Sequence, residues 1–224
     1  MANRTRRSSF EGWLLPFQGW PLVGWAALLL ALTSAGIFAL EGWSEEAVRT
    51  LVRATARVSI VLFLLAFAAS SLRRVWRSPA SAWLLRNRRY MGVSFGLSHF
   101  VHLGALLALG SSFPEPFLSA LGLVTILGGG LAYVFIAAMV ATSFDRTAAW
   151  LGPRRWKLLH RVGSYYIWII FAQSYLPRAL ADPRYAPPAI ALFAVLALRF
   201  GVRAHEPRAR RQPPPSQHHR AGWG

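Results

Sequence analysis

Three of the six histidines lie inside or at the edge of long apolar stretches, where polar side chains are costly and tend to be functional. His99 and His102 share one stretch, and His160 lies at the start of another. Imidazole is a usual axial ligand of haem iron, and helix bundles commonly hold cofactors between facing helices. A single histidine in such a stretch fits a hydrogen-bonded structural role equally well, but histidines on two helices favour haem. His99 and His102 are three residues apart, so they lie on neighbouring faces of one helix and do not point equally at one ligand.

The remaining residue types limit this chemistry. The chain has no cysteine, which excludes disulfides, thiolate metal sites, cysteine-anchored iron–sulfur clusters and covalently attached c-type haem. A metal or cofactor must therefore be held by histidine, carboxylate or backbone groups. Arg57 is expected to be a buried charge that either extends to the membrane surface or pairs with a haem propionate. No glycine-rich phosphate loop or dinucleotide fingerprint is present, so the sequence predicts no flavin- or nicotinamide-binding domain in this chain.

The composition sets the class of the protein. The 224 residues are 54% hydrophobic and 15% charged, whereas an ordinary soluble domain has roughly 25% charged residues. A helix needs about 20 apolar residues to cross a bilayer core of ~30 Å. The sequence therefore predicts an all-α polytopic membrane protein, a bundle of six transmembrane helices over Pro21–Leu40, Ala54–Leu72, Tyr90–Ser111, Ala120–Phe144, Leu158–Leu176 and Pro187–Arg203.

The basic residues gather in alternate connections between these stretches, as they do in cytoplasmic loops. Nineteen of the 25 lie in the N-terminal segment, the second and fourth connections and the C-terminal segment, while five of the eight acidic residues lie on the opposite side. We therefore expect both termini to be cytoplasmic, in the inner membrane of a bacterium. The net charge of +17 is interpreted as a topology signal and not as a nucleic-acid-binding face, because the basic residues alternate with apolar stretches.

These patterns divide the chain into a cytoplasmic N-terminal segment (1–20), the transmembrane domain (21–203) and a cytoplasmic tail (204–224). The tail is basic and proline-rich, so we expect it to be disordered. The first stretch is a full-length span and is expected to stay as a helix instead of being removed as a signal peptide.

Two further clusters are better explained by structure than by ligand binding. His218 and His219 lie in the tail and fit a solvated linker better than a site for adventitious metal. Gly128, Gly129 and Gly130 lie inside the fourth stretch, where close helix packing explains them better than the approach of a flat cofactor.

A series of short motifs runs from the second stretch to the sixth. The motifs are Thr55-Ala56-Arg57, Ser70-Ser71-Leu72-Arg73-Arg74, Arg88-Arg89-Tyr90-Met91-Gly92-Val93, His102-Leu103, Thr142-Ser143, Leu151-Gly152, Trp156, Leu159-His160-Arg161 and Ala197-Leu198-Arg199-Phe200. In this order and spacing they resemble the ferric reductase-like transmembrane domain family over about residues 53–203. Within that family the likeness is nearest to the haem-binding membrane subunits of the periplasmic methionine sulfoxide reductase system.

The resemblance implies a six-helix bundle that carries electrons across the membrane through b-type haem held between the third and fifth helices. His102 matches the family's third-helix ligand of haem iron, and His160 matches the first of two fifth-helix histidines. The second falls thirteen residues later, where this chain has Gln173. The family's tyrosine four residues after His160 is Ser164 here.

The departure at Gln173 concerns the outer of the two levels at which haem is expected in the bundle, the one farther from the cytoplasm. At about 1.5 Å of rise per residue, His102 lies roughly 20 Å along the third helix and is expected at the level of Gln173. Glutamine is a poor iron ligand compared with imidazole, so the outer site is predicted to lack one axial partner. His99, about one turn from His102, is an alternative partner if the helices are offset.

The inner level is expected to hold His160, about 5 Å past Lys157 on the fifth helix. There it meets Arg88 of the third helix, which is either an alternative ligand or a propionate partner. The iron ligands expected across the two levels are therefore His102 and His160.

Three hypotheses follow. The first is a haem b electron-transfer subunit that delivers electrons to an extracytoplasmic reductase partner, with quinone or a partner's flavin as the electron source. The second is a haem-poor member of the same fold that serves as a membrane anchor or assembly partner. The third is a transporter or quinone-site protein whose histidines handle protons; it ranks last because the spans lack the chains of carboxylates that proton relays use.

Overall fold

The structure is a computed structural model that describes residues 17–115 and 122–204. Almost all of this part of the chain is helical, and it contains no strand. The N-terminal residues 1–16 and the tail from residue 205, including His218 and His219, lie outside the described residues. The elements are α2 (Trp20–Glu41), α3 (Glu45–Val75), α4 (Pro79–Arg86), α5 (Arg88–Ser112), α7 (Leu123–Ala141), α8 (Asp145–Leu151), α9 (Pro153–Ala181), the 3₁₀ turn η2 (Pro183–Tyr185) and α10 (Ala186–Ala204).

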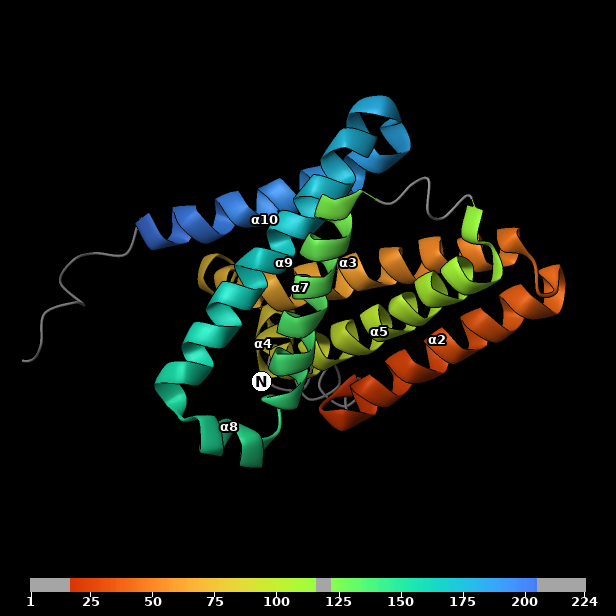
Figure 1. Cartoon of the computed structure of the whole chain (residues 1–224). Helices are drawn as coiled ribbons and strands as arrows, with labels where there is room; N and C mark the ends of the chain where they lie inside the picture. Colours follow the sequence, from red (N-terminus) through yellow and green to blue (C-terminus); the bar gives the residue numbers. More distant parts are fainter. Residues whose placement is uncertain (1–16, 116–121, 205–224) are drawn as a thin grey trace, which may run out of the picture.

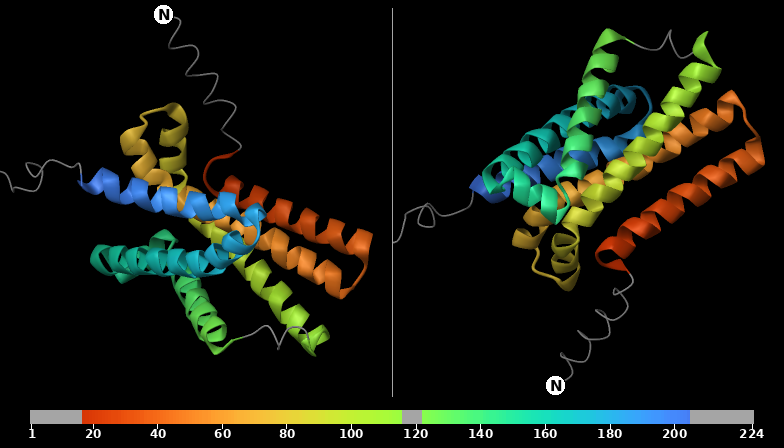
Figure 2. Two further views of the ribbon diagram at one scale, coloured as in Figure 1. Left: turned by 90° about the horizontal axis from the view of Figure 1, so that it is seen from above. Right: turned by 60° about the horizontal axis from the view of Figure 1, so that its bottom comes forward.

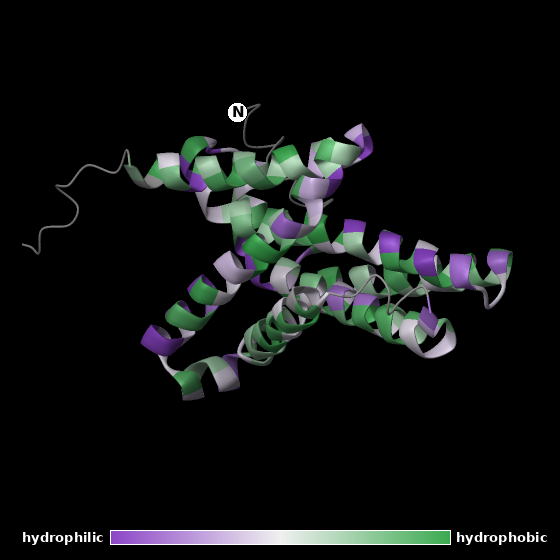
Figure 3. Cartoon of the chain, turned by 45° about the horizontal axis from the view of Figure 1, so that its top comes forward, coloured by the Kyte–Doolittle hydropathy of each residue, from purple (hydrophilic) through white to green (hydrophobic). Residues whose placement is uncertain are grey.

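Each of the six predicted apolar stretches corresponds to one long helix, namely α2, α3, α5, α7, α9 and α10. Four helical segments of the described chain are long and apolar enough to cross a membrane: α2, α3, α5 and the segment Pro183–Val202. A fifth is added if α7 and α8 are taken as one span bent by 108°. Green, hydrophobic residues recur along the long helices in Figure 3, with purple, hydrophilic residues between them. The chain is therefore an integral membrane protein with several apolar helices.

The helix boundaries differ from the predicted stretches where polar residues form the first turns. α3 begins nine residues before the predicted Ala54, because the Ser44 hydroxyl accepts a hydrogen bond from the Ala47 backbone N–H at 3.1 Å and caps the helix. Glu45 lies in the first turn and pairs with Arg49 one turn later. α9 begins at Pro153, directly after Gly152 with φ of 79°, and continues through Pro177 to Ala181. The short helices α4 and α8 were not predicted.

The helices form two groups, which the views of Figures 1 and 2 show. α2, α3 and α5 lie side by side, with the most extensive contact between α3 and α5, while α7 packs along α9. α10 contacts both α3 and α9 and so joins the groups. The core between them is largely aromatic and contains Phe63 and Phe67 of α3, Phe95 of α5, Ile136 of α7, Phe171 of α9 and Leu192 of α10.

One end of the bundle collects most of the described arginines, and we call it the arginine-rich end. It comprises the connection 73–89, the α7–α8–α9 junction and the last turns of α10. Trp20 at the start of α2 stacks on Phe144 at 5.2 Å, and Arg89 forms an ion pair with Asp145 at 2.6 Å. At the opposite end, Asp182 accepts hydrogen bonds from the guanidinium Nε and the backbone N–H of Arg184, which hold the pKa of that carboxyl below its usual range.

Candidate functional site

His102 of α5 is held by the backbone of α3. Its Nδ1 lies 3.1 Å from the Val52 carbonyl oxygen and 3.0 Å from the Thr55 hydroxyl. A carbonyl oxygen only accepts, so Nδ1 carries the hydrogen and Nε2 carries the lone pair. Histidines that bind metal commonly donate their second ring N–H to a carbonyl or carboxylate in this way. His102 is therefore in the tautomer in which Nε2 can bind a metal ion.

A short series of buried hydroxyls continues this contact between α3 and α5. The Ser59 hydroxyl donates to Ser98 at 2.9 Å, and Ser98 donates to the Thr55 carbonyl at 3.2 Å. Small polar residues let two helices approach closely and satisfy one another in an apolar environment. This packing fixes the rotation of α5 that brings His102 to Val52.

His99 faces a different set of neighbours, as its spacing from His102 predicts. Its ring lies 5.1 Å from Tyr133 of α7, 5.8 Å from Phe171 of α9 and 5.3 Å from His102, measured between ring centroids. Its Nδ1 and the Tyr133 hydroxyl are both buried and have no hydrogen-bond partner among the described residues. The rings of His99 and His102 are stacked at 28°, so the two histidines do not face each other across a common iron.

His160 of α9 lies at the arginine-rich end. Its ring stacks on Trp156 at 4.2 Å, and its Nε2 lies 3.2 Å from the Thr142 hydroxyl. The Trp156 indole donates to the Thr142 carbonyl at 2.9 Å, which joins α9 to the end of α7. Ser164, at the position of the family's tyrosine, donates to the His160 carbonyl at 2.5 Å.

The other predicted site residues are distributed between the two levels. Arg88 donates from Nε to the Ala66 carbonyl at 3.0 Å and lies within electrostatic range of His160. Arg57 is exposed, which corrects the expectation of a buried charge, because its position on α3 faces away from α5. Gln173 is exposed and makes no hydrogen bond to the described residues, whereas Phe171, two residues earlier, contacts His99.

The glycines in the fourth stretch behave as packing residues at one position. The Tyr166 hydroxyl donates to the Gly128 carbonyl at 3.0 Å, and a Cβ added at Gly128 would lie 3.4 Å from the Ile170 side chain. Nothing lies within 4 Å of a Cβ added at Gly129 or Gly130. Close approach of α9 therefore explains Gly128 and not the other two.

Arg199 is a polar interior residue to which the sequence assigned no role. It is 9% exposed and donates to the Phe67 carbonyl of α3 at 2.8 Å and to the Tyr165 hydroxyl of α9 at 3.2 Å. An arginine inside the last apolar stretch, four residues before the Arg203 that ends it, was the available signal, since charges within a span tend to be functional.

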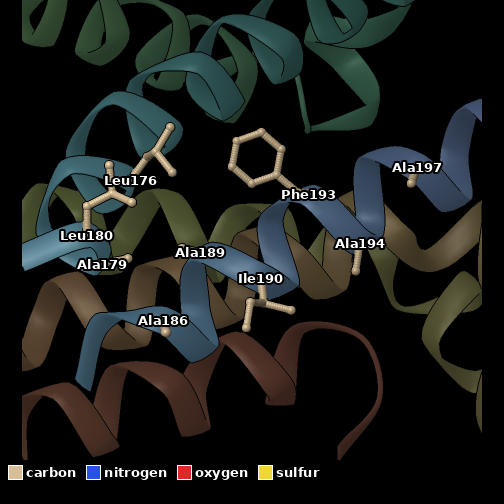
Figure 4. Close-up of a pocket in the computed structure, with 9 residues that line it drawn as sticks. All are labelled: Leu176, Ala179, Leu180, Ala186, Ala189, Ile190, Phe193, Ala194 and Ala197. Atoms are coloured by element: carbon tan, nitrogen blue, oxygen red, sulfur yellow. The ribbon is translucent and has the colours of Figure 1, made fainter. Parts of the chain in front are cut away.

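An open apolar groove lies between α9 and α10, away from the histidines. It has a volume of about 510 Å³ and is lined by Leu176, Leu180, Ile190 and Phe193 with alanines between them (Figure 4). Its lining offers no residue that could ligate a metal. Elsewhere in the described chain, no three His, Asp or Glu side chains gather into a metal-binding cluster.

The fold and these side chains define a helical integral membrane protein with imidazoles at two separate positions in its bundle. Two curated relatives, the protein-methionine-sulfoxide reductase heme-binding subunits MsrQ of Bordetella parapertussis and Bordetella bronchiseptica, are 30% identical over 169 residues, covering 71% of this chain and 69% of theirs. The MsrQ of Polaromonas naphthalenivorans is 28% identical over 166 residues, covering 68% of this chain and 69% of its own. The chain belongs to this family of MsrQ heme-binding subunits.

Two other comparisons give no match. No family model matches the chain, and no solved structure matches it. The resemblance to the MsrQ branch, inferred above from short motifs, is confirmed by the curated relatives.

Proposed function

We propose that this chain is a haem b subunit that carries electrons across the membrane to an extracytoplasmic methionine sulfoxide reductase. The observation that carries the proposal is His102, whose Nδ1 is engaged by the Val52 carbonyl and whose Nε2 is thereby free for iron. The relatives' name, heme-binding subunit, supports the cofactor. Their name also supports a reductase as the partner.

The residues present fit haem in kind. His102 supplies a neutral imidazole nitrogen. The buried His99 Nδ1 and Tyr133 hydroxyl have no hydrogen-bond partner among the described residues, and a bound group can provide one. At the inner level, His160 has only the Thr142 hydroxyl at its Nε2, a partner that iron would replace. Bound haem would supply a one-electron carrier at each level that it occupies.

The chain's own residues then position and insulate the carrier. The Val52 carbonyl and Thr55 hydroxyl fix the ring of His102, and Trp156 fixes the ring of His160 by stacking. The aromatic core of Phe63, Phe95 and Phe171 lies beside the outer level, where His99 and His102 are, and excludes water from it. We further propose six membrane crossings with both termini cytoplasmic, a ferric reductase-like bundle, and quinone or a partner's flavin as the electron source.

Absorption spectra of the purified full-length protein test the proposal. We expect the oxidised and dithionite-reduced spectra to show haem, and the pyridine haemochrome to identify it as type b. His102→Ala and His160→Ala should each lower the haem content or change its spectrum, because each removes a nitrogen ligand. His99→Ala, the matched change one turn away, should have the smaller effect.

Added imidazole provides the control for misfolding. A variant that has lost only a ligand should recover its spectrum when millimolar imidazole fills the vacated position, whereas an unfolded variant should not. Unchanged haem in both His102→Ala and His160→Ala would remove these two ligands from the proposal. A protein purified without any haem would favour the second candidate, a membrane anchor or assembly partner of the reductase.

A further inference from the structure

Two arginines at the arginine-rich end point into the bundle instead of outward. Arg199 donates to the Phe67 carbonyl, and Arg88 donates to the carbonyl of the preceding residue, Ala66. The Arg199 guanidinium also lies 4.3 Å from the centre of the Phe67 ring and 5.4 Å from that of Tyr165. The two arginines therefore meet on one turn of α3 and lie within electrostatic range of each other.

This inward orientation is unusual for arginines near a membrane surface. Long basic side chains near helix ends ordinarily extend their charge to the interface, and Arg74, Arg77 and Arg86 at the same end are exposed. Arg199 is instead 9% exposed. Moving a charge out of water is strongly unfavourable unless an opposite charge and hydrogen bonds compensate for it.

No compensating charge is supplied by the described part of the chain. The carboxylates that form ion pairs there are those of Glu45, Glu46, Asp145 and Asp182, and none of these pairs with Arg88 or Arg199. Both acceptor carbonyls belong to α3, which offers dipoles and no net charge. Beyond Nε of Arg88 and Nε and Nη1 of Arg199, the guanidinium N–H groups make no hydrogen bond to described residues.

His160, the proposed iron ligand at this end, lies on α9 five residues before Tyr165, to which Arg199 donates. Arg88 also lies within electrostatic range of His160. Two guanidinium groups present a positive, planar set of donors that suits carboxylates. We propose that Arg88 and Arg199 form a carboxylate-binding site for the two propionates of the haem held by His160, with Tyr165 orienting Arg199. This inference rests on the proposed function and assigns roles to Arg199 and Tyr165 within it.

Reconstitution with a neutral analogue tests the charge requirement directly. The haem-depleted full-length protein is titrated with haem and with haem dimethyl ester, which has the same ring without the carboxylates. A His102→Ala background confines binding to the His160 level. Losing one charge-assisted hydrogen bond weakens binding by about tenfold to a hundredfold, so the protein should prefer haem over the ester by at least about tenfold.

Substitutions then assign the preference to named residues. Arg199→Leu should abolish most of the preference for haem over the ester, while Arg199→Lys should keep part of it because the charge remains. Tyr165→Phe should reduce the preference by a smaller factor, since it removes only the hydroxyl that orients Arg199. Arg86→Leu is the matched control: it removes an exposed arginine from the same end of the molecule and should leave the preference unchanged.

A second readout is the reduction potential of the haem bound at this level. Arg199→Leu should lower it, because losing a nearby positive charge favours the oxidised, more positive form, whereas Arg86→Leu should not. Equal affinity of the Arg199-containing protein for haem and its dimethyl ester would overturn the inference while leaving the proposed function intact. Absence of any haem binding would instead overturn the proposed function.

The other source of an oxyanion is a lipid phosphate. If Arg199→Leu reduced the amount of phosphatidylglycerol bound from defined vesicles and left the preference for haem over its ester unchanged, the site would be a lipid site and the inference would be wrong. The ester comparison in the protein with Arg199 intact decides the matter even if the Arg199 variants fail to fold.

Discussion

A histidine can bind iron only through an unprotonated ring nitrogen, and single hydrogen bonds decide which nitrogen that is. The Val52 carbonyl leaves Nε2 of His102 free, whereas His160 has its Nε2 beside a hydroxyl. Gln173, which replaces a histidine expected from the family resemblance, carries no such nitrogen. The replacement of a single histidine by Gln173 is therefore the clearest difference between this chain and a protein with a full set of imidazole ligands.

Gln173→His tests the departure. The side chain is exposed, so a ring of similar size should be accommodated. The family resemblance, which matches position 173 to a histidine, is what places an iron ligand there, since Phe171 and not Gln173 contacts His99. We expect the variant to gain low-spin bis-imidazole haem relative to the parent, measured by absorption and electron paramagnetic resonance spectra.

Adding His102→Ala to Gln173→His should remove that gain, because the new imidazole would lose its partner; the four proteins form a cycle that isolates the coupling between the two positions. An unchanged spin state and haem stoichiometry in Gln173→His would show that position 173 does not reach the iron. It would favour the membrane-anchor hypothesis over electron transfer.

At the scale of elements, the helices are held together where small residues let side chains of a neighbour approach. Gly96 on α5 faces Val140 of α7, and Gly163 on α9 faces Met139, the residue before Val140. α7 therefore fits between α5 and α9 through two adjacent side chains, each opposite a glycine. This contact connects the helix of His102 to the helix of His160.

Gly96→Ala should disturb this contact. The added Cβ would clash with a methyl group of Val140, and overpacking of this kind destabilises by about 1–3 kcal/mol. Thermal unfolding in detergent should show the loss. Gly92→Ala, one turn earlier on the same helix, meets nothing within 4 Å and should be neutral or slightly stabilising.

Combining Gly96→Ala with Val140→Ala should recover part of the stability, because the shortened side chain makes room for the new methyl group. Equal unfolding temperatures for Gly96→Ala and Gly92→Ala would show that α5 and α7 do not pack as described.

At the scale of the whole molecule, the six long helices reverse direction in turn, so the start of α2 and the end of α10 both lie at the arginine-rich end (Figure 1). This matches the alternation of basic residues along the sequence, since positive connections stay in the cytoplasm. Four or five of the helical segments meet the length and composition expected of a membrane span. α9 is not among them: charged residues fill its first turns, Arg178 lies in its last turn, and polar residues such as Ser164 and Gln173 lie between.

Reporter fusions test the orientation and the number of crossings. A reporter active only outside the cytoplasm should be silent when fused after Gly224 or inserted between α7 and α8, and active when inserted at 112–117 or within 182–185. The last position decides whether α9 crosses. Activity between α7 and α8 together with silence within 182–185 would reverse the proposed topology, and silence within 182–185 alone would reduce the number of crossings.

The sequence by itself determined the helical class, the six long helices and the membrane environment, because the length and apolar content of a segment are local properties that set its helix. The motifs around His102 and His160 were also sufficient to predict the family. Helix ends were predicted less well. The Ser44 cap starts α3 before its apolar part, and the polar residues there do not contribute to the hydrophobic pattern from which the stretch was predicted.

Only the tertiary structure decided which way each polar side chain faces. Arg57 and Arg199 both lie in apolar stretches, yet Arg57 is exposed and Arg199 is buried against Phe67 and Tyr165. The same holds for Phe171 and Gln173, neighbours on α9 of which only the first reaches His99. The reason is physical: the rotation of a helix that is apolar on most sides is set by the shapes of the helices packed against it, and those contacts come from residues far away in the chain.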